Sequence, residues 1–126
     1  MGAILVVDDD AQVLELVSEM LKLEGHVVTA VTNGLEATEE FHSSHFDLVI
    51  TDLIMPEQEG LETICEMRKT AQALPIIAIS GGGRIGAADY LASAAQLGAN
   101  ATLAKPFKRN ELVSTVTELL GTSGAA

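Results

Sequence analysis

The chain has 126 residues, enough for one domain that buries its core without disulfides or a structural metal. Its 18 acidic and 7 basic residues give a net charge of -11, which disfavours direct binding to nucleic acid or to an anionic membrane surface. No apolar stretch approaches the roughly 20 residues of a membrane span and no secretory signal opens the chain, so we expect a soluble cytoplasmic protein.

The first half of the chain predicts three strands and two helices in alternation. Apolar runs indicate strands over residues 4–7, 27–31 and 46–51. Between the first two, apolar residues recur at helical spacing, with Asp9 or Asp10 as the N-cap and Gly25 as the stop. Asn33 is expected to cap a short second helix that continues through Phe41.

The second half continues the same alternation. Leu61, Ile64 and Met67 mark a third helix, and Pro75 precedes a strand over residues 76–79. An alanine-rich helix over residues 87–97, a strand over residues 101–104 and a last helix closed by Gly121 follow. We therefore expect one domain over residues 1–121, with a flexible tail over residues 122–126.

Five strands alternating with five helices predict a parallel sheet covered by helices on both faces. The runs at residues 5–7, 48–50 and 76–79 are continuously apolar, as expected for strands that are buried on both faces. The simplest arrangement is a flavodoxin-like (βα)5 three-layer α/β sandwich with strand order 2-1-3-4-5. This order places the first and third strands side by side.

Polar residues follow four of these strands, and they should meet at the carboxyl edge of the sheet. They are Asp8 with Asp9, Asp52, Ser80 and Lys105. Carboxylates so close together repel one another, and an oxygen-only set of ligands suits Mg2+. Lys105 and Ser80 could bind the oxygens of a phosphoryl group, so the edge suits an aspartyl phosphate on Asp52.

The chain resembles the receiver domains of two-component response regulators over essentially its whole length. Residues 4–10 (ILVVDDD) resemble the acidic-pocket strand of the family, and residues 51–56 (TDLIMP), with Gly60 after them, resemble its phosphoacceptor segment. Ile79-Ser80 matches the Ser/Thr position of the family, and Lys105-Pro106 matches its Lys-Pro motif. The four motifs occur in the family's order and at comparable spacing.

The resemblance implies a role for each of these residues. Asp52 would accept a phosphoryl group from a sensor histidine kinase or a histidine phosphotransfer protein. Mg2+ would be held by Asp8, Asp9, Asp52 and the backbone carbonyl of Ile54. Output would pass through contacts with an unknown downstream protein, because the chain shows no effector domain.

Two segments depart from the usual family pattern. Thr102 stands three positions before Lys105, where most members carry an aromatic residue that moves when the switch operates. Residues 81–86 (GGGRIG) form a glycine-rich loop that we expect to be mobile.

Several residues also have simpler explanations. Gly81, Gly83 and Gly86 match a dinucleotide-binding fingerprint in form, although the remaining chain is too short for most of such a fold. Asp10 is better explained as a helix cap than as a metal ligand. His42 and His45 are better explained as a solvated helix end than as a metal site. Cys65 is expected to be a half-buried small side chain.

Two other functions compete with a phosphorelay receiver. A haloacid dehalogenase-type phosphohydrolase also uses an Asp nucleophile at the end of a strand, but it needs a second Asp two residues later, where this chain has Ile54. A degenerate receiver that acts only as a binding module is the other alternative, although Asp52, Ser80 and Lys105 are all present.

Overall fold

A computed structural model describes residues 2–52, 60–81, 98–105 and 107–123. The described strands are β1 (Ala3–Val7), β2 (Val27–Val31), β3 (Leu48–Asp52), β4 (Ile76–Gly81) and β5 (Ala101–Lys105). The described helices are α1 (Ala11–Leu23), α2 (Gly34–Ser43), α3 (Gly60–Arg68) and α5 (Arg109–Ser123). None of these helices combines the length and apolar character needed to cross a membrane.

The strands form one parallel sheet in the order β2-β1-β3-β4-β5, which confirms the predicted flavodoxin-like topology. β1 lies beside β3, with Val7 opposite Thr51. β3 lies beside β4, with Asp52 opposite Ile79. The ends of these three strands therefore meet at one edge of the sheet.

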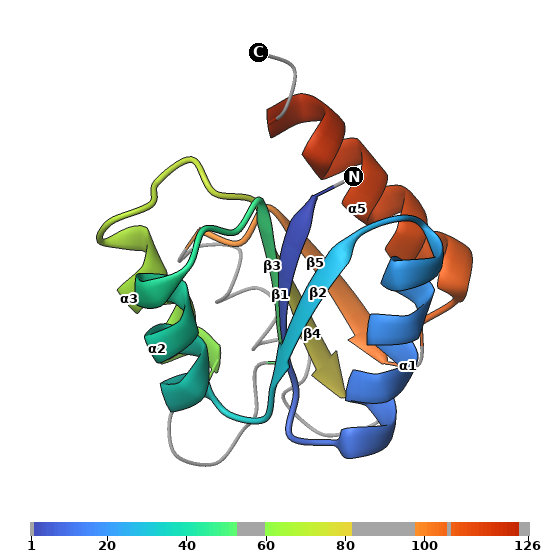
Figure 1. Ribbon diagram of the computed structural model, residues 1–126, viewed down its shortest axis with the longest axis horizontal. Helices are drawn as coiled ribbons and strands as arrows, with labels where there is room; N and C mark the ends of the chain where they lie inside the picture. The colour runs from blue at the N-terminus through green and yellow to red at the C-terminus, as the bar shows by residue number, and fades with distance from the viewer. Residues whose placement is uncertain (1, 53–59, 82–97, 106, 124–126) are drawn as a thin grey trace.

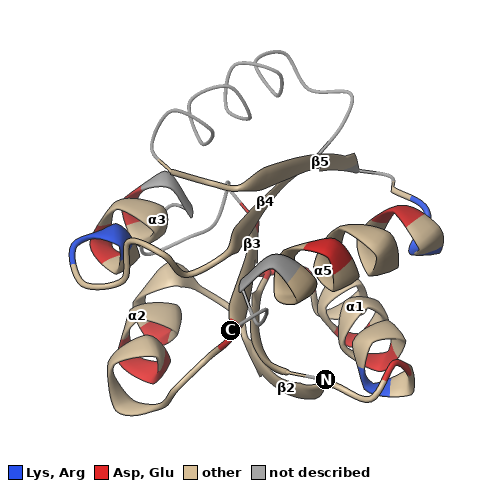
Figure 2. Ribbon diagram, turned by 90° about the horizontal axis from the view of Figure 1, so that it is seen from above, with Lys and Arg blue, Asp and Glu red and all other residues tan. Residues whose placement is uncertain are grey.

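Helices cover both faces of the sheet, with α2 and α3 on one side and α1 and α5 on the other (Figures 1 and 2). Alternate residues of the strands enter two separate hydrophobic clusters. Cluster 1, beneath α2 and α3, contains Leu5, Val7, Val31, Ala37, Phe46, Val49, Ile64, Met67, Ile76 and Ala78. Cluster 2, beneath α1 and α5, contains Ile4, Val6, Val17, Leu21, Leu48, Ile50, Ile77, Ile79, Leu112 and Val116.

The predicted caps explain where the first two helices begin. Asp10, rather than Asp9, caps α1 by accepting hydrogen bonds from the backbone N–H groups of Gln12 and Val13. Asn33 caps α2 by accepting from the backbone N–H of Glu36. Gly25, which follows α1, has a φ of 92°, a conformation that other residues rarely adopt.

Several boundaries differ from those expected from the sequence, and four of the strands extend one or two residues further at one end. α2 continues two residues past Phe41, to Ser43. β3 begins at Leu48 rather than Phe46, because the side chain of Asp47 turns to accept a hydrogen bond from the backbone N–H of Ala3 at 2.8 Å. α5 continues past Gly121 to Ser123, because glycine accepts helical geometry as well as a left-handed one.

The expectation for Cys65 is wrong, because its side chain is exposed on α3 while Ile64 and Met67 are buried. The expected helix over residues 87–97 and most of the glycine-rich loop lie outside the described residues, as do Ile54 and Pro106.

Candidate functional site

Three carboxylates meet at the carboxyl edge of the sheet, as the sequence predicts. Asp8 follows β1, and Asp52 ends the neighbouring strand β3. Asp8, Asp9 and Asp52 each offer one carboxylate oxygen, and these oxygens all lie within 4.8 Å of one another. Asp8 and Asp52 are 2% and 5% exposed, whereas Asp9 is exposed. The cluster is therefore anchored in the protein and open to solvent on one side.

Backbone hydrogen bonds hold the Asp8 end of this cluster in place. The N–H of Asp8 donates to the carbonyl of Val31 at 3.2 Å, which extends the pairing of β1 with β2. Oδ1 of Asp8 accepts from the N–H of Asp10 at 2.9 Å. The side chain of Asp10 instead caps α1, in agreement with the simpler explanation of that residue.

Ser80 lies one residue beyond the ladder pair formed by Asp52 and Ile79. Its side chain is fully buried, and its Oγ has no hydrogen-bond partner among the described residues. An unsatisfied buried hydroxyl costs about 1 to 3 kcal/mol, so few structures keep one without a reason. A ligand that supplied an acceptor at this edge would remove that cost.

The remaining predicted residues are described only in part. Lys105 ends β5 opposite Gly81, so the backbone of Lys105 reaches the same edge of the sheet. The structure does not describe the side chain of Lys105. Thr102 is exposed and lies opposite Ala78 in the ladder of β4 and β5. The predicted backbone ligand at Ile54 falls outside the described residues.

The donor set fits a hard divalent cation. All three donors are carboxylate oxygens, and no sulfur or imidazole belongs to the cluster. Mg2+ is bound by one or two carboxylates while it retains several waters, and the exposed side of this cluster leaves room for them. The two histidines near the end of α2 belong to no such cluster among the described residues.

The family model for the response regulator receiver domain matches residues 4–117. The chain belongs to this family. Receiver domains are phosphoacceptor signalling modules rather than classical enzymes, and an acidic triad of the kind formed by Asp8, Asp9 and Asp52 is typical of their Mg2+ sites.

Known proteins similar to this receiver include both regulators and solved structures. It is 36% identical over 125 residues to a transcriptional regulatory protein CpxR homolog of Haemophilus influenzae, covering 99% of this chain and 53% of that protein. It is similar to a putative response regulator of Chloroflexus aurantiacus, with 30% identity, a TM-score of 0.88, and coverage of 95% and 98% of the two chains.

A third relative is response regulator protein TrrA of Thermotoga maritima, solved in complex with Mg2+ and beryllofluoride. The identity is 35% and the TM-score is 0.84, and the match covers 94% of this chain and 99% of that one. The chain spans about half the length of the curated relatives that it matches.

Two features of the structure were not predicted from the sequence. Arg68, at the end of α3, binds the backbone of Gly98 and the side chain of Asn100. A pocket lies at the other end of the sheet, between the α2–β3 and α3–β4 turns. Contacts between residues 30 apart leave no periodic signal in a sequence, although Gly98 itself stands out as the end of the alanine-rich segment.

Proposed function

We propose that this receiver accepts a phosphoryl group on Asp52 from a sensor histidine kinase or a histidine phosphotransfer protein. Asp8, Asp9 and Asp52 would hold Mg2+, together with the backbone carbonyl of Ile54. Ser80 and Lys105 would bind oxygens of the phosphoryl group. Asp52 is the acceptor in this proposal because it ends β3, between Asp8, which follows β1, and Ser80 on β4.

Ser80 lies one residue beyond the strand pair of Asp52 and Ile79, and its buried Oγ has no hydrogen-bond partner among the described residues; this is the observation that carries the proposal. A phosphoryl oxygen on Asp52 would give this hydroxyl an acceptor that the described residues do not supply, so phosphorylation would offset the cost of burying it.

The proposed transfer forms one bond and breaks one. A carboxylate oxygen of Asp52 attacks the phosphorus of a phosphohistidine, forming an O–P bond as the N–P bond breaks. The imidazole nitrogen leaves with the electron pair and takes up a proton. Bound Mg2+ would supply charge neutralisation between the carboxylates and the phosphoryl oxygens, and the ammonium of Lys105 would add positive charge.

The phosphorylated receiver would act through contacts with a downstream protein in the cytoplasm. The curated relatives are about twice the length of this chain and include transcriptional regulators, but the charge of -11 disfavours DNA binding by the receiver itself. We therefore propose a protein target.

Incubation with acetyl phosphate and Mg2+, followed by intact-mass measurement, tests the acceptor. The wild type should gain one phosphoryl group, and Asp52→Asn should gain none. Asp10→Asn is the matched control, because Asn caps helices as well as Asp does and Asp10 lies outside the carboxylate cluster. Labelling of Asp52→Asn to the wild-type extent would refute the assignment.

A further inference from the structure

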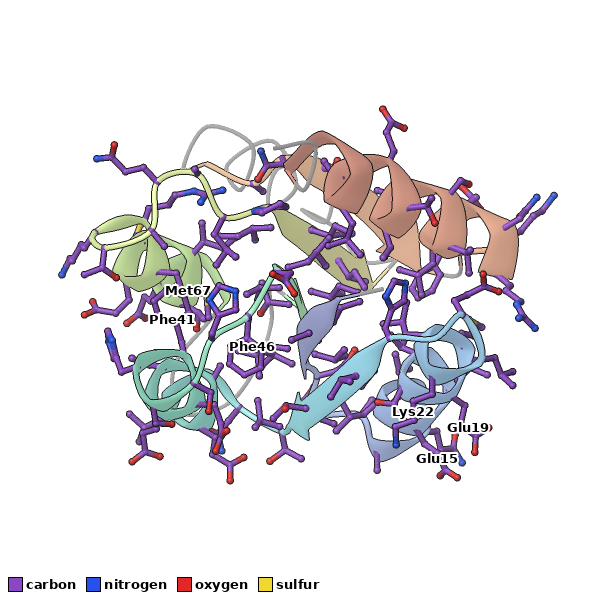
Figure 3. All side chains as sticks on the ribbon, turned by 45° about the horizontal axis from the view of Figure 1, so that its top comes forward. Glu15, Glu19, Lys22, Phe41, Phe46 and Met67 are labelled. Atoms are coloured by element: carbon purple, nitrogen blue, oxygen red, sulfur yellow. The ribbon has the colours of Figure 1, made fainter. Side chains whose placement is uncertain are left out.

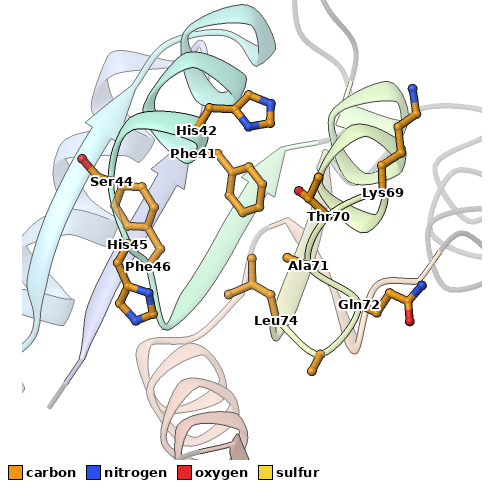
Figure 4. Close-up of a pocket in the computed structure, with 11 residues that line it drawn as sticks. Phe41, His42, Ser44, His45, Phe46, Lys69, Thr70, Ala71, Gln72 and Leu74 are labelled. Carbon is orange, nitrogen blue, oxygen red and sulfur yellow. The ribbon is translucent and has the colours of Figure 1, made fainter.

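A trough of about 820 Å³ lies at the edge of the sheet opposite the carboxylate cluster. One wall is the end of α2 and the turn into β3, residues 41–46, and the other is the turn from α3 to β4, residues 69–74 (Figure 4). We call this feature the amino-edge trough. Its volume falls within the roughly 300 to 1,000 Å³ typical of small-molecule sites.

Three large apolar side chains form part of the lining of the amino-edge trough, beside polar ones such as Thr70 and Gln72. Phe41, Phe46 and Leu74 line it, and all three pack on or within cluster 1. Phe46 is 7% exposed, so its ring is fixed by the core beneath it (Figure 3). A rigid apolar floor of this kind favours an alkyl or aryl group over a flexible polar one.

Every ionisable side chain that lines the amino-edge trough is basic. Lys69 lies on the α3 side, and His42 and His45 lie on the α2 side. No acidic residue lines the trough, although the chain contains 18 of them and carries a charge of -11. Lys69 therefore offers an ammonium group, and the two histidines offer ring nitrogens, to an anion on a protein that otherwise repels anions.

Two of these basic groups already have acidic partners just outside the trough. Nζ of Lys69 lies 3.1 Å from Oε2 of Glu66, and Nε2 of His45 lies 3.1 Å from Oδ1 of Asp47. Both pairs are exposed to solvent, where such contacts contribute only about 0 to 1 kcal/mol. A carboxylate seated above an apolar group can therefore replace Glu66 as the partner of Lys69.

We propose that the amino-edge trough binds a small amphipathic carboxylate, with its alkyl or aryl body on Phe41, Phe46 and Leu74 and its carboxylate beside Lys69. This site does not depend on phosphoryl acceptance, because it lies at the other end of the strands from Asp52. Binding should accordingly be unchanged in Asp52→Asn.

Titration of the 15N-labelled chain with 3-phenylpropionate, followed by NMR at low salt and neutral pH, tests the site. Saturable shifts should be concentrated in residues 41–46 and 69–74. Two further probes separate the contributions: 3-phenylpropan-1-ol keeps the aryl body without the charge, and propionate keeps the charge without the body. Each should bind at least about fivefold more weakly, because each loses one half of the recognition.

Lys69→Gln should weaken binding of 3-phenylpropionate roughly three- to tenfold, as expected for loss of one charge-assisted contact. Lys22→Gln is the matched control, because it removes the same charge from α1, on the far side of the sheet (Figure 3). Equal effects of the two variants, equal binding of the alcohol, or shifts scattered over the chain would overturn the proposal. Tighter binding of the peptide acetyl-Asp-Glu-Phe-Asp-Glu-amide would overturn it in favour of a protein segment.

Discussion

Arg68 holds the backbone carbonyl of Gly98 with two hydrogen bonds, from Nε at 3.1 Å and from Nη2 at 2.6 Å. The same guanidinium donates to the carbonyl of Ala71 and to Oδ1 of Asn100, each at 2.8 Å. Partial burial lowers the pKa of Arg68 from its ordinary value, but a guanidinium stays charged in proteins. One side chain thus ties the end of α3 to the segment that enters β5.

Gly98→Ala should destabilise the protein more than Gly25→Ala does. Both glycines have positive φ, 121° and 92°, so both variants carry backbone strain of about 1 to 3 kcal/mol. A Cβ on Gly98 would also lie 2.8 Å from Nε of Arg68, whereas a Cβ on Gly25 meets nothing within 4 Å. Urea unfolding measures both free energies.

The contribution of Arg68 can be isolated by repeating this comparison in an Arg68→Ala background. The excess cost of Gly98→Ala over Gly25→Ala should shrink there, because the side chain it displaces is gone. An undiminished excess would mean that Arg68 is not the cause.

Ser80→Ala should raise the free energy of unfolding of the unmodified protein by about 1 kcal/mol, since it removes a buried hydroxyl without a described partner. It should also reduce the rise in melting temperature caused by Mg2+ with beryllofluoride, a mimic of the phosphoryl group. Ser18→Ala is the control, because Ser18 in α1 is also buried and its Oγ also has no hydrogen-bond partner in the described part of the chain. Ser18→Ala should leave the beryllofluoride response unchanged, and an equal loss in both variants would contradict the role of Ser80.

Millimolar Mg2+ should raise the melting temperature, because a cation bound between Asp8, Asp9 and Asp52 relieves their repulsion only in the folded state. Asp9→Asn should reduce this rise, and Asp10→Asn should not. Thermal unfolding of the wild type and both variants, with and without Mg2+ at constant ionic strength, measures these changes in melting temperature. A wild-type melting temperature that does not change with Mg2+ would count against the metal site.

Stability should fall as the pH is lowered below about 6.5, the ordinary pKa of histidine. Partial burial lowers the pKa of His26, and its Nδ1 accepts a hydrogen bond from the N–H of Gly2 at 3.1 Å, which requires an unprotonated nitrogen. Between the lowered pKa of His26 in the folded state and its ordinary pKa in the unfolded state, the unfolded state binds more protons than the folded state does. The stabilisation that the neutral His26 provides is therefore complete above this pH range and is lost as the pH falls through it. His26→Asn should flatten the pH dependence of the unfolding free energy between pH 7 and 5, and an identical slope in the variant would exclude His26 as its source.

The carboxylate cluster could be predicted because it depends on strand ends alone. Once the order of the strands is known, Asp8 and Asp52 must meet, since parallel strands share one carboxyl edge. An earlier start of β3 was expected because Phe46 is apolar, but the side chain of Asp47 accepts a hydrogen bond from the backbone N–H of Ala3 and the strand begins at Leu48. Arg68 could not be paired with Gly98 in advance, since no local pattern indicates a side-chain bond to a distant carbonyl.

The amino-edge trough could not be predicted from the sequence either. The sequence favours a solvated helix end for His42 and His45 over a metal site, and it does not indicate that they border a pocket together with Lys69. The trough forms between two loops that are distant in the sequence, the α2–β3 loop and the α3–β4 loop. Neither loop carries a sequence pattern that indicates contact with the other.

The separation of the hydrophobic core into two clusters governs how mutations in it will combine. Ile4 and Leu5 are neighbours in the chain, yet Ile4 packs in cluster 2 and Leu5 in cluster 1. Truncations of these two residues disturb different layers and should have nearly additive costs, whereas Leu5 and Val49 share a cluster on paired strands and should couple. The sheet thus acts as a partition, and a cavity opened on one side leaves the packing on the other side largely unchanged.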